Sequence, residues 1–168
     1  MAGIYTEKEK LNHTLEYVSN TLNTSGFGDW FIFFGTLLGI VREDSCIDGD
    51  DDIDIMINCD YWQLRKVFEE KGFSFTSEYN IKEPDTILKT NTTSMYSSID
   101  FYFCTVNNGD YFTPWHKVNS TNSTPIVRKK WRSCDIQLPN NYIDKIIAMY
   151  GSNWKIPQSM SCRTGMSV

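Results

Sequence analysis

Four aspartates within five residues, set in an isoleucine-rich segment, limit how this chain can fold. Residues 50–54 read Asp-Asp-Asp-Ile-Asp, and Ile55, Met56 and Ile57 follow directly. Like charges this close repel one another, and aspartate is disfavoured in strands. The alternation of isoleucine with aspartate nevertheless predicts a β-strand over residues 52–57 with one apolar and one charged face. We therefore expect positive charge to gather against the charged face.

The spacing of Asp52 and Asp54 predicts a metal site. Residues two apart in a strand project from the same face, with Cα atoms about 6.6 Å apart. Two carboxylates at that spacing can converge on one or two divalent cations. Because the ligands offered are all oxygen atoms, the site favours Mg²⁺ or Mn²⁺ over zinc.

Two other interpretations of the acidic run are weaker. Asp48, Asp50 and Asp52 match the first three ligands of an EF-hand calcium loop, but Ile53 stands where glycine is required and Cys59 where glutamate belongs. A solvated acidic turn is the other alternative. The apolar residues that follow the run argue against it, because a surface turn has no reason to be so hydrophobic.

Hydrophobic periodicity and capping signals predict an α/β protein. The length of 168 residues suits one domain, with an N-terminal helix within residues 1–26. We expect helices over residues 7–23, 37–41, 60–72 and 141–150. Strands are expected over residues 30–34, 52–57, 73–75, 86–88 and 95–104. Residues 107–125 are rich in turn-forming residues and are expected to form one long loop, a candidate lid or substrate loop.

A third carboxylate is expected to join the first two. In the strand predicted over residues 95–104, Ile99, Phe101 and Phe103 alternate with Asp100 and Tyr102. Asp100 should therefore point away from the apolar face, as Asp52 and Asp54 do. If the two strands are neighbours, the three carboxylates meet. Taken alone, Asp100 could equally be a solvent-facing group.

Gly35 and Thr36 are candidate phosphate-binding residues. They stand where the predicted strand over residues 30–34 turns into a helix. A small residue there lets a phosphate approach backbone N–H groups, and a helix N-terminus favours negative charge. The pair is weak evidence alone and gains weight from the acidic strand that follows.

Charge and cysteine content exclude several classes of protein. The formal net charge is -5, which argues against a nucleic-acid partner because such partners need a broad basic surface. The five cysteines are odd in number, scattered and without a C-x-x-C pair. They fit neither a disulfide framework nor a zinc site and are interpreted as reduced thiols, mostly buried.

The chain shows no secretory signal and no transmembrane segment. No basic region followed by an apolar run opens the sequence, and no window approaches the roughly 20 apolar residues of a membrane span. We therefore expect a cytoplasmic protein. Five N-x-S/T sequons would be glycan acceptors in a secreted protein, but are interpreted as chance in this Asn-, Ser- and Thr-rich chain; they begin at Asn12, Asn23, Asn91, Asn119 and Asn122.

Two sequence blocks resemble the signature of the LicD/fukutin family. The first block reads GTLLGIVR at residues 35–42, followed after a short loop by DDDIDI at residues 50–55. A closing segment supports the likeness through Pro139, Asn140, Asn141, Tyr142, Tyr150, Gly151, Trp154 and Pro157. The resemblance covers about residues 30 to 157. The first block is long and specific, whereas the closing one is weak by itself.

The resemblance implies a nucleotidyltransferase (DNA polymerase-β-like) fold with a mixed central sheet flanked by helices. It implies transfer of a phospho-alcohol, such as phosphocholine or ribitol phosphate, from a CDP-linked donor to a glycan or glycolipid hydroxyl. Position by position, Asp52 and Asp54 match the metal-binding pair and Asp100 the third acidic residue. The phosphate-contacting turn matches Gly35, Thr36 and Arg42.

Two departures from the family pattern bear on the donor. Asp48 and Gly49 stand in place of a Pro-Trp pair, and Glu43 replaces a histidine. The identity of the alcohol is therefore more open than the chemistry. Arg42 could clamp a phosphate oxygen bidentately or form a salt bridge to Asp50, and neither alternative is preferred.

Other functions and site residues stay open at this point. The same fold could move a nucleoside monophosphate from a triphosphate to a protein, small molecule or nucleic acid, or could persist as an inactive nucleotide-binding module. Trp115 and Trp131 are candidates for stacking on a sugar or base, while His116 is expected to be structural. A basic cluster is interpreted mainly as a solvated face; it consists of Arg128, Lys129, Lys130 and Arg132.

Overall fold

Helices and strands alternate up to β3, seven strands follow one another from β3 to β9, and a four-stranded sheet forms the centre of the described chain. The computed structural model describes residues 7–76, 85–113 and 119–158. Its helices are α1 (Glu7–Thr24), α2 (Phe34–Glu43), α3 (Tyr61–Glu70) and α4 (Tyr142–Tyr150). Its strands are β1 (Trp30–Ile32), β2 (Asp52–Ile57), β3 (Ile87–Lys89), β4 (Ser98–Phe103), β5 (Thr105–Asn107), β6 (Asp110–Phe112), β7 (Asn119–Ser120), β8 (Val127–Trp131) and β9 (Cys134–Leu138).

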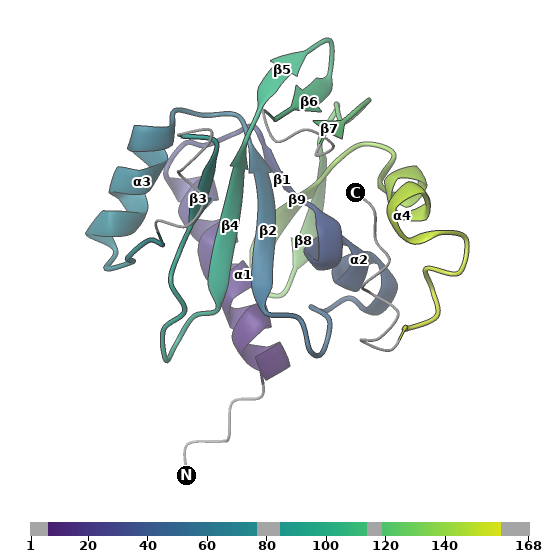
Figure 1. The fold of residues 1–168 in the computed structure, drawn as a ribbon, viewed down its shortest axis with the longest axis horizontal. Helices are drawn as coiled ribbons and strands as arrows, with labels where there is room; N and C mark the ends of the chain where they lie inside the picture. Colours follow the sequence, from purple (N-terminus) through teal and green to yellow (C-terminus); the bar gives the residue numbers. More distant parts are fainter. Residues whose placement is uncertain (1–6, 77–84, 114–118, 159–168) are drawn as a thin grey trace.

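The central sheet is mixed, which confirms the α/β class. Its strand order is β1-β2-β4-β3, with β2 and β4 parallel at the centre and both outer pairs antiparallel. Figure 1 shows α1 behind this sheet, with α3 and α2 on opposite sides in that view. The opposite face of the sheet carries the acidic residues of β2.

The apolar face of the sheet packs against α1. Helix α1 buries Leu11, Leu15, Val18 and Leu22, which recur at helical spacing along one side. Alternate residues of β2, beginning with Ile53, are fully buried in the same core. The predicted helix over residues 7–23 and the predicted strand over residues 52–57 are both confirmed.

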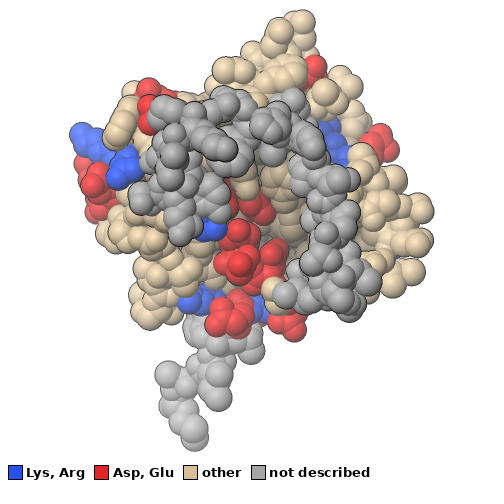
Figure 2. Space-filling model, viewed as in Figure 1, with Lys and Arg blue, Asp and Glu red and all other residues tan. Residues whose placement is uncertain are grey.

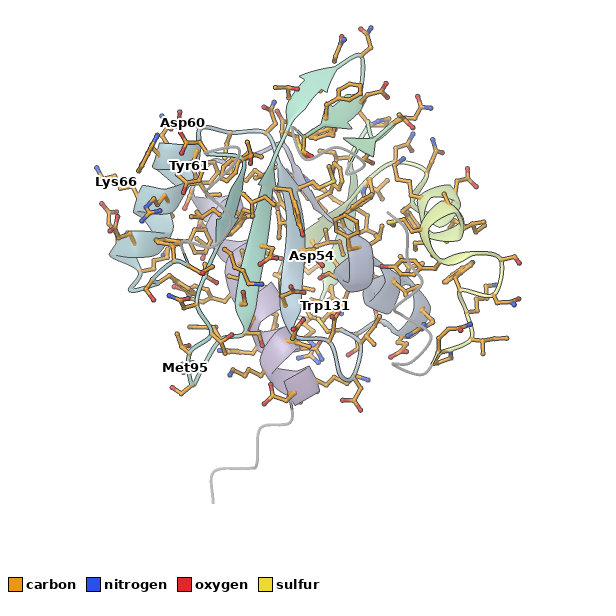
Figure 3. All side chains as sticks on the ribbon, in the orientation of Figure 1. Asp54, Asp60, Tyr61, Lys66, Met95 and Trp131 are labelled. Atoms are coloured by element: carbon orange, nitrogen blue, oxygen red, sulfur yellow. The ribbon has the colours of Figure 1, made fainter. Side chains whose placement is uncertain are left out.

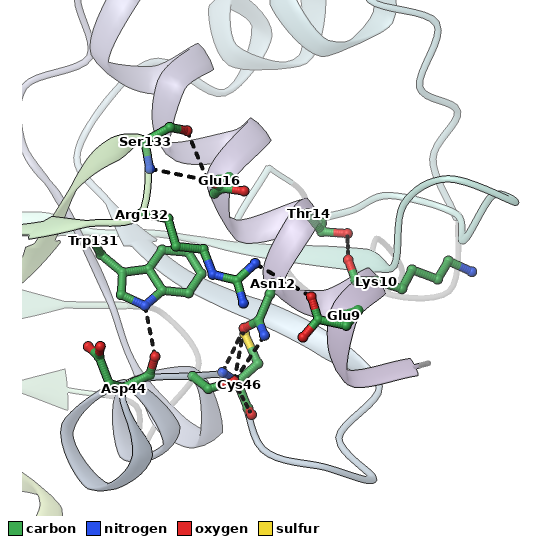
Figure 4. Close-up of polar contacts among 11 residues, drawn as sticks. Glu9, Lys10, Asn12, Thr14, Glu16, Asp44, Cys46, Trp131, Arg132 and Ser133 are labelled. Carbon is green, nitrogen blue, oxygen red and sulfur yellow. Dashed lines mark hydrogen bonds and ion pairs between the residues drawn. The ribbon is translucent and has the colours of Figure 1, made fainter. Parts of the chain in front are cut away.

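Polar contacts from α1 and β8 hold the segment that leads into β2. The Cys46 backbone N–H donates to Asn12 Oδ1 at 2.8 Å, and Asn12 Nδ2 donates to Ser45 Oγ at 2.9 Å (Figure 4). Trp131 Nε1 donates to the Asp44 carbonyl oxygen at 2.9 Å. Asn12 is fully buried, so its amide braces the folded chain and has no room for a glycan.

The pair of strands β8 and β9 is absent from the sequence prediction. They form a hairpin in which Trp131 pairs with Cys134, and Arg132 adopts a φ of 51° in the turn. Trp131 is buried, so the expectation that it stacks on a substrate is wrong. In the predicted basic cluster, Lys129 pairs with Asp44 at 3.2 Å and Arg132 pairs with Glu9 at 3.6 Å.

Residues 107–125, expected as one long loop, contain β6 and β7. With β5 these strands form a small antiparallel sheet, drawn above the central sheet in Figure 1. Turn-forming residues such as Asn108 and Gly109, both at positive φ, connect β5 to β6. The sequence shows the turn chemistry, but the strands are too short to have a clear alternation. Trp115 and His116 lie outside the described residues.

Other boundaries differ from the prediction by a few residues. The strand expected over residues 30–34 ends at Ile32, and the helix expected over residues 37–41 spans Phe34–Glu43. The strand expected over residues 95–104 is Ser98–Phe103, and that over residues 86–88 is Ile87–Lys89. Phe75 makes only an isolated bridge to Thr90, in place of the strand expected over residues 73–75.

The spacing of Ile143, Ile146 and Ile147 predicts that all three face inward from the helix over residues 141–150, but α4 buries only one of them. Ile146 is buried, whereas Ile143 and Ile147 are about two-fifths exposed, at 40% and 41%. The helix ends at Tyr150 before Gly151, as the sequence predicts. No described helix combines the length and the apolar content that crossing a membrane requires.

We expect Asn12→Ala to destabilise the folded protein. The substitution leaves the buried Cys46 N–H without its acceptor, which costs about 1–3 kcal/mol of unfolding free energy. Thermal unfolding should show a lower Tm for Asn12→Ala than for Asn20→Ala, because Asn20 lies on the exposed side of the same helix. Equal Tm values for the two variants would contradict the bracing role of Asn12.

Candidate metal centre

Three carboxylates meet on the open face of the two central strands. The parallel register pairs Asp54 of β2 with Asp100 of β4 and Asp52 with Ser98. Carboxylate oxygens of Asp52, Asp54 and Asp100 all lie within 4.8 Å of one another. Figure 2 shows acidic side chains gathered near the middle of this face, and Figure 3 shows Asp54 on β2. The structure thus brings together the three residues that the alternation patterns selected.

The turn from β1 into α2 holds Asp54 in place. The Asp54 backbone N–H donates to Thr36 Oγ1 at 3.0 Å, and the Phe33 N–H donates to the Asp54 carbonyl oxygen at 3.1 Å. Phe34 adopts a φ of 48°, which turns the chain from strand to helix within one residue. Thr36 is buried, and its hydroxyl contacts the backbone of β2.

Two residues that the sequence analysis did not select also contact the carboxylates. The Tyr102 hydroxyl donates to Asp54 Oδ1 at 3.3 Å. Lys89 Nζ lies 3.6 Å from Asp100 Oδ1 and 4.0 Å from Asp52 Oδ2. Tyr102 could have been found, because it stands two residues after Asp100 and so shares its face. Lys89 could not, because only the pairing of β3 with β4 places it opposite Asp100.

Burial and mutual repulsion favour the protonated form of these carboxyl groups when no cation is present. Burial first, and then the charge of Asp100, raise the pKa of Asp52 to about 7. Burial, followed by the charges of Asp52 and Asp100, raises the pKa of Asp54 well above its ordinary value. Burial also raises the pKa of Asp100, against the opposing influence of Lys89. A cation bound among the three carboxylates would offset both the loss of hydration on burial and their mutual repulsion.

A buried oxygen atom of Asp100 without a hydrogen bond indicates that a cation fits this site. Asp100 is buried, and its Oδ1 atom accepts no hydrogen bond in the structure. Lys89 Nζ, at 3.6 Å, forms an ion pair just beyond hydrogen-bond length. An acceptor atom of this kind, beside two further carboxylates, offers the oxygen-only ligand set that Mg²⁺ or Mn²⁺ prefers. Asp50, Asp51 and Asp52 form a second, more exposed group within the same distance limit of 4.8 Å.

The first turn of α2 lies against Asp50. A Cβ atom on Gly35 would lie 2.5 Å from Asp50 Oδ2, so glycine lets this carboxylate approach the helix backbone. Arg42 forms its salt bridge with Glu43, at 2.8 Å, rather than with Asp50. Its guanidinium also donates to the Trp154 carbonyl oxygen at 3.3 Å. Phosphate binding by Gly35, Thr36 and Arg42 stays a prediction.

A family comparison matches most of the chain. The profile described as LicD/FKTN/FKRP, nucleotidyltransferase domain, matches residues 29–157. The chain belongs to the LicD/FKTN/FKRP family. The match begins just before β1 and ends after α4, so it includes the complete carboxylate cluster. Membership indicates a transferase that handles phospho-alcohols. A comparison with curated proteins gives no match.

Gly39 is expected to be far less tolerant of a side chain than Gly35. A Cβ atom on Gly39 would lie 2.6 Å from the Ser45 carbonyl oxygen and 3.0 Å from the Ile47 backbone nitrogen. Because these backbone atoms cannot move aside cheaply, Gly39→Ala should lower the unfolding free energy by about 1–3 kcal/mol. At Gly35 the obstacle is a carboxylate that can rotate. Denaturant titration should therefore show a clearly smaller loss for Gly35→Ala, and the reverse order would contradict this packing.

We expect Asp54→Asn to stabilise the metal-free protein increasingly as the pH rises. Because the pKa of Asp54 is raised in the folded state, the unfolded chain loses this proton at a lower pH than the folded protein does. The free energy of unfolding of the wild type therefore falls as the pH rises above about 4. Asparagine has no such proton. With EDTA present, the Tm advantage of Asp54→Asn over wild type should be larger at about pH 7 than at about pH 4.

The matched control for this measurement is Asp48→Asn, since Asp48 is exposed in the preceding loop. Its Tm difference from wild type should change little across the same pH range. A Tm difference between Asp54→Asn and wild type that does not grow from pH 4 to pH 7 would contradict the raised pKa of Asp54.

Proposed function

We propose that this chain is a metal-dependent transferase with a nucleotidyltransferase (DNA polymerase-β-like) fold. It moves a phospho-alcohol, such as phosphocholine or ribitol phosphate, from a CDP-linked donor to a hydroxyl of a glycan or glycolipid. The observation that carries the proposal is the cluster of Asp52, Asp54 and Asp100 on adjacent parallel strands, with an acceptor atom of Asp100 left unbonded. Family membership supports the substrate class.

The three carboxylates are the residues that would hold Mg²⁺ or Mn²⁺. A divalent ion bound there would polarise the donor diphosphate and stabilise charge on the departing nucleotide. Asp54 is braced from both sides, by Thr36 through its backbone and by the Tyr102 hydroxyl through its side chain. Rigid support of this kind holds the ligand oxygens in a fixed geometry before the substrate arrives.

The reaction is a displacement at the phosphorus that carries the alcohol. The acceptor hydroxyl oxygen forms a new bond to that phosphorus, while the bond from phosphorus to the bridging oxygen breaks and CMP leaves. The proton of the acceptor hydroxyl needs a base, and Asp100 is the candidate because its carboxylate lies in the same cluster as Asp52 and Asp54. Gly35, Thr36 and Arg42 are proposed to line the donor-phosphate side.

Loss of any one of the three carboxylates should slow turnover strongly. We expect Asp52→Asn, Asp54→Asn and Asp100→Asn each to slow CMP release from a CDP-alcohol by roughly 100-fold or more, because each removes charge that supports the cation. The measurement is CMP formation from CDP-choline and CDP-ribitol, with Mg²⁺ and a panel of glycan acceptors. Asp144→Asn, at an exposed position on α4, should retain activity.

CMP formation, pyrophosphate release and thermal stabilisation by nucleotides together separate the alternative functions. Release of pyrophosphate from a nucleoside triphosphate, with no CMP from any CDP-alcohol, would mean that the chain transfers a nucleoside monophosphate instead. Nucleotide binding that raises the Tm without turnover of any donor would identify an inactive nucleotide-binding module. Full activity of Asp54→Asn would overturn the metal-dependent mechanism.

A further inference from the structure

Lys89 is the cationic side chain that forms ion pairs with the carboxylate cluster, among the residues the structure describes. It ends β3, whose antiparallel pairing with β4 places Lys89 directly opposite Asp100. Its Nζ atom lies 3.6 Å from Asp100 Oδ1 and 4.0 Å from Asp52 Oδ2. The Lys89 side chain is 26% exposed, so water screens these contacts only in part.

The position of Lys89 makes it a competitor for the oxygens that a metal would use. Asp100 Oδ1 is the unbonded acceptor of the cluster, and the ammonium group of Lys89 is directed at that same atom. Asp52 Oδ2 is shared in the same way. A divalent cation that binds these oxygens must therefore approach a fixed positive charge or displace it, and both cost free energy.

The charges of the cluster show in which direction Lys89 changes the affinity for a metal. In the form that binds metal, Asp52, Asp54 and Asp100 carry three negative charges, and Lys89 contributes one positive charge. Asp50 and Asp51, which are grouped with Asp52, add further negative charge, so the positive charge of Lys89 offsets only part of the total. Without Lys89 the cluster would keep one further negative charge, and its attraction for a divalent cation would be stronger.

We propose that Lys89 is an internal counter-ion that shares the carboxylate cluster with the metal and weakens its binding. It partly neutralises Asp52 and Asp100 before the metal arrives and limits how tightly the site retains a cation afterwards. Lys89 acts through these carboxylates, so it is a positioning residue rather than a catalytic one. This inference rests on the metal site of the proposed function.

The test is metal affinity, measured without reference to activity. Isothermal titration of the full chain with Mn²⁺ at about pH 8, where protons compete less for the carboxylates, should give a dissociation constant about tenfold lower for Lys89→Met than for wild type. Lys89→Arg retains the charge and should bind Mn²⁺ within about twofold of wild type. Lys89→Gln removes the same charge and serves if the methionine variant does not fold.

Lys66→Met is the matched control, because Lys66 is highly exposed on α3 and pairs with Glu70. Its Mn²⁺ affinity should equal that of wild type. Unchanged or weaker Mn²⁺ binding by Lys89→Met would overturn the role of Lys89 alone and leave the metal site intact. An absence of Mn²⁺ binding in wild type and in every Lys89 variant would overturn the metal site, and this inference with it.

Discussion

The parallel pairing of β2 with β4 is the interaction on which the rest of the structure depends. Its register sets Asp54 opposite Asp100 and leaves Asp52 on the same face. Three carboxylates are thereby confined within 4.8 Å of one another, with Asp54 and Asp100 buried and Asp52 half-buried. Such an arrangement opposes folding, because each group loses hydration and repels the other two. The buried apolar face of the same strands, packed on α1, offsets this cost.

The residues around the cluster reduce its instability in different ways. Lys89 contributes a compensating charge, and Tyr102 contributes a hydrogen-bond donor, which burial and the Asp54 charge keep protonated by raising the Tyr102 pKa. Thr36 fixes the backbone of Asp54 from α2. Farther away, Asn12 and Trp131 secure the segment that leads into β2. Apart from Thr36, these supports of the acidic strand lie outside the LicD/FKTN/FKRP signature block.

The agreement between sequence and structure is best where one segment carries its own signal. The alternation of isoleucine with aspartate in β2, and the helical spacing of leucines in α1, each follow from a single periodicity. The start of the helix predicted over residues 60–72 is of the same kind, since the Asp60 side chain caps α3 by accepting from the Gln63 N–H at 2.9 Å. Prediction failed for β8, whose inward positions are mixed with charged residues, and for the short strands β6 and β7.

Trp131 shows that neighbouring residues in the sequence do not determine whether a side chain is exposed. Beside a basic cluster it resembles a surface aromatic available for stacking, but the β8–β9 hairpin turns it inward to bond the Asp44 carbonyl oxygen. Ile143 and Ile147 show the opposite error, because an apolar face on α4 does not guarantee a partner to cover it. Burial depends on which segments pack together, and no single segment encodes that.

The sequence by itself determined the charged strand, the face that its aspartates share and the family to which the chain belongs. Those properties follow from side-chain alternation within one strand and from a contiguous motif. Only the tertiary structure decided that Asp100 completes the cluster, that Lys89 is directed into it and that Thr36 braces it. Strand order and register bring these residues together, and both arise from pairing between segments far apart in the chain.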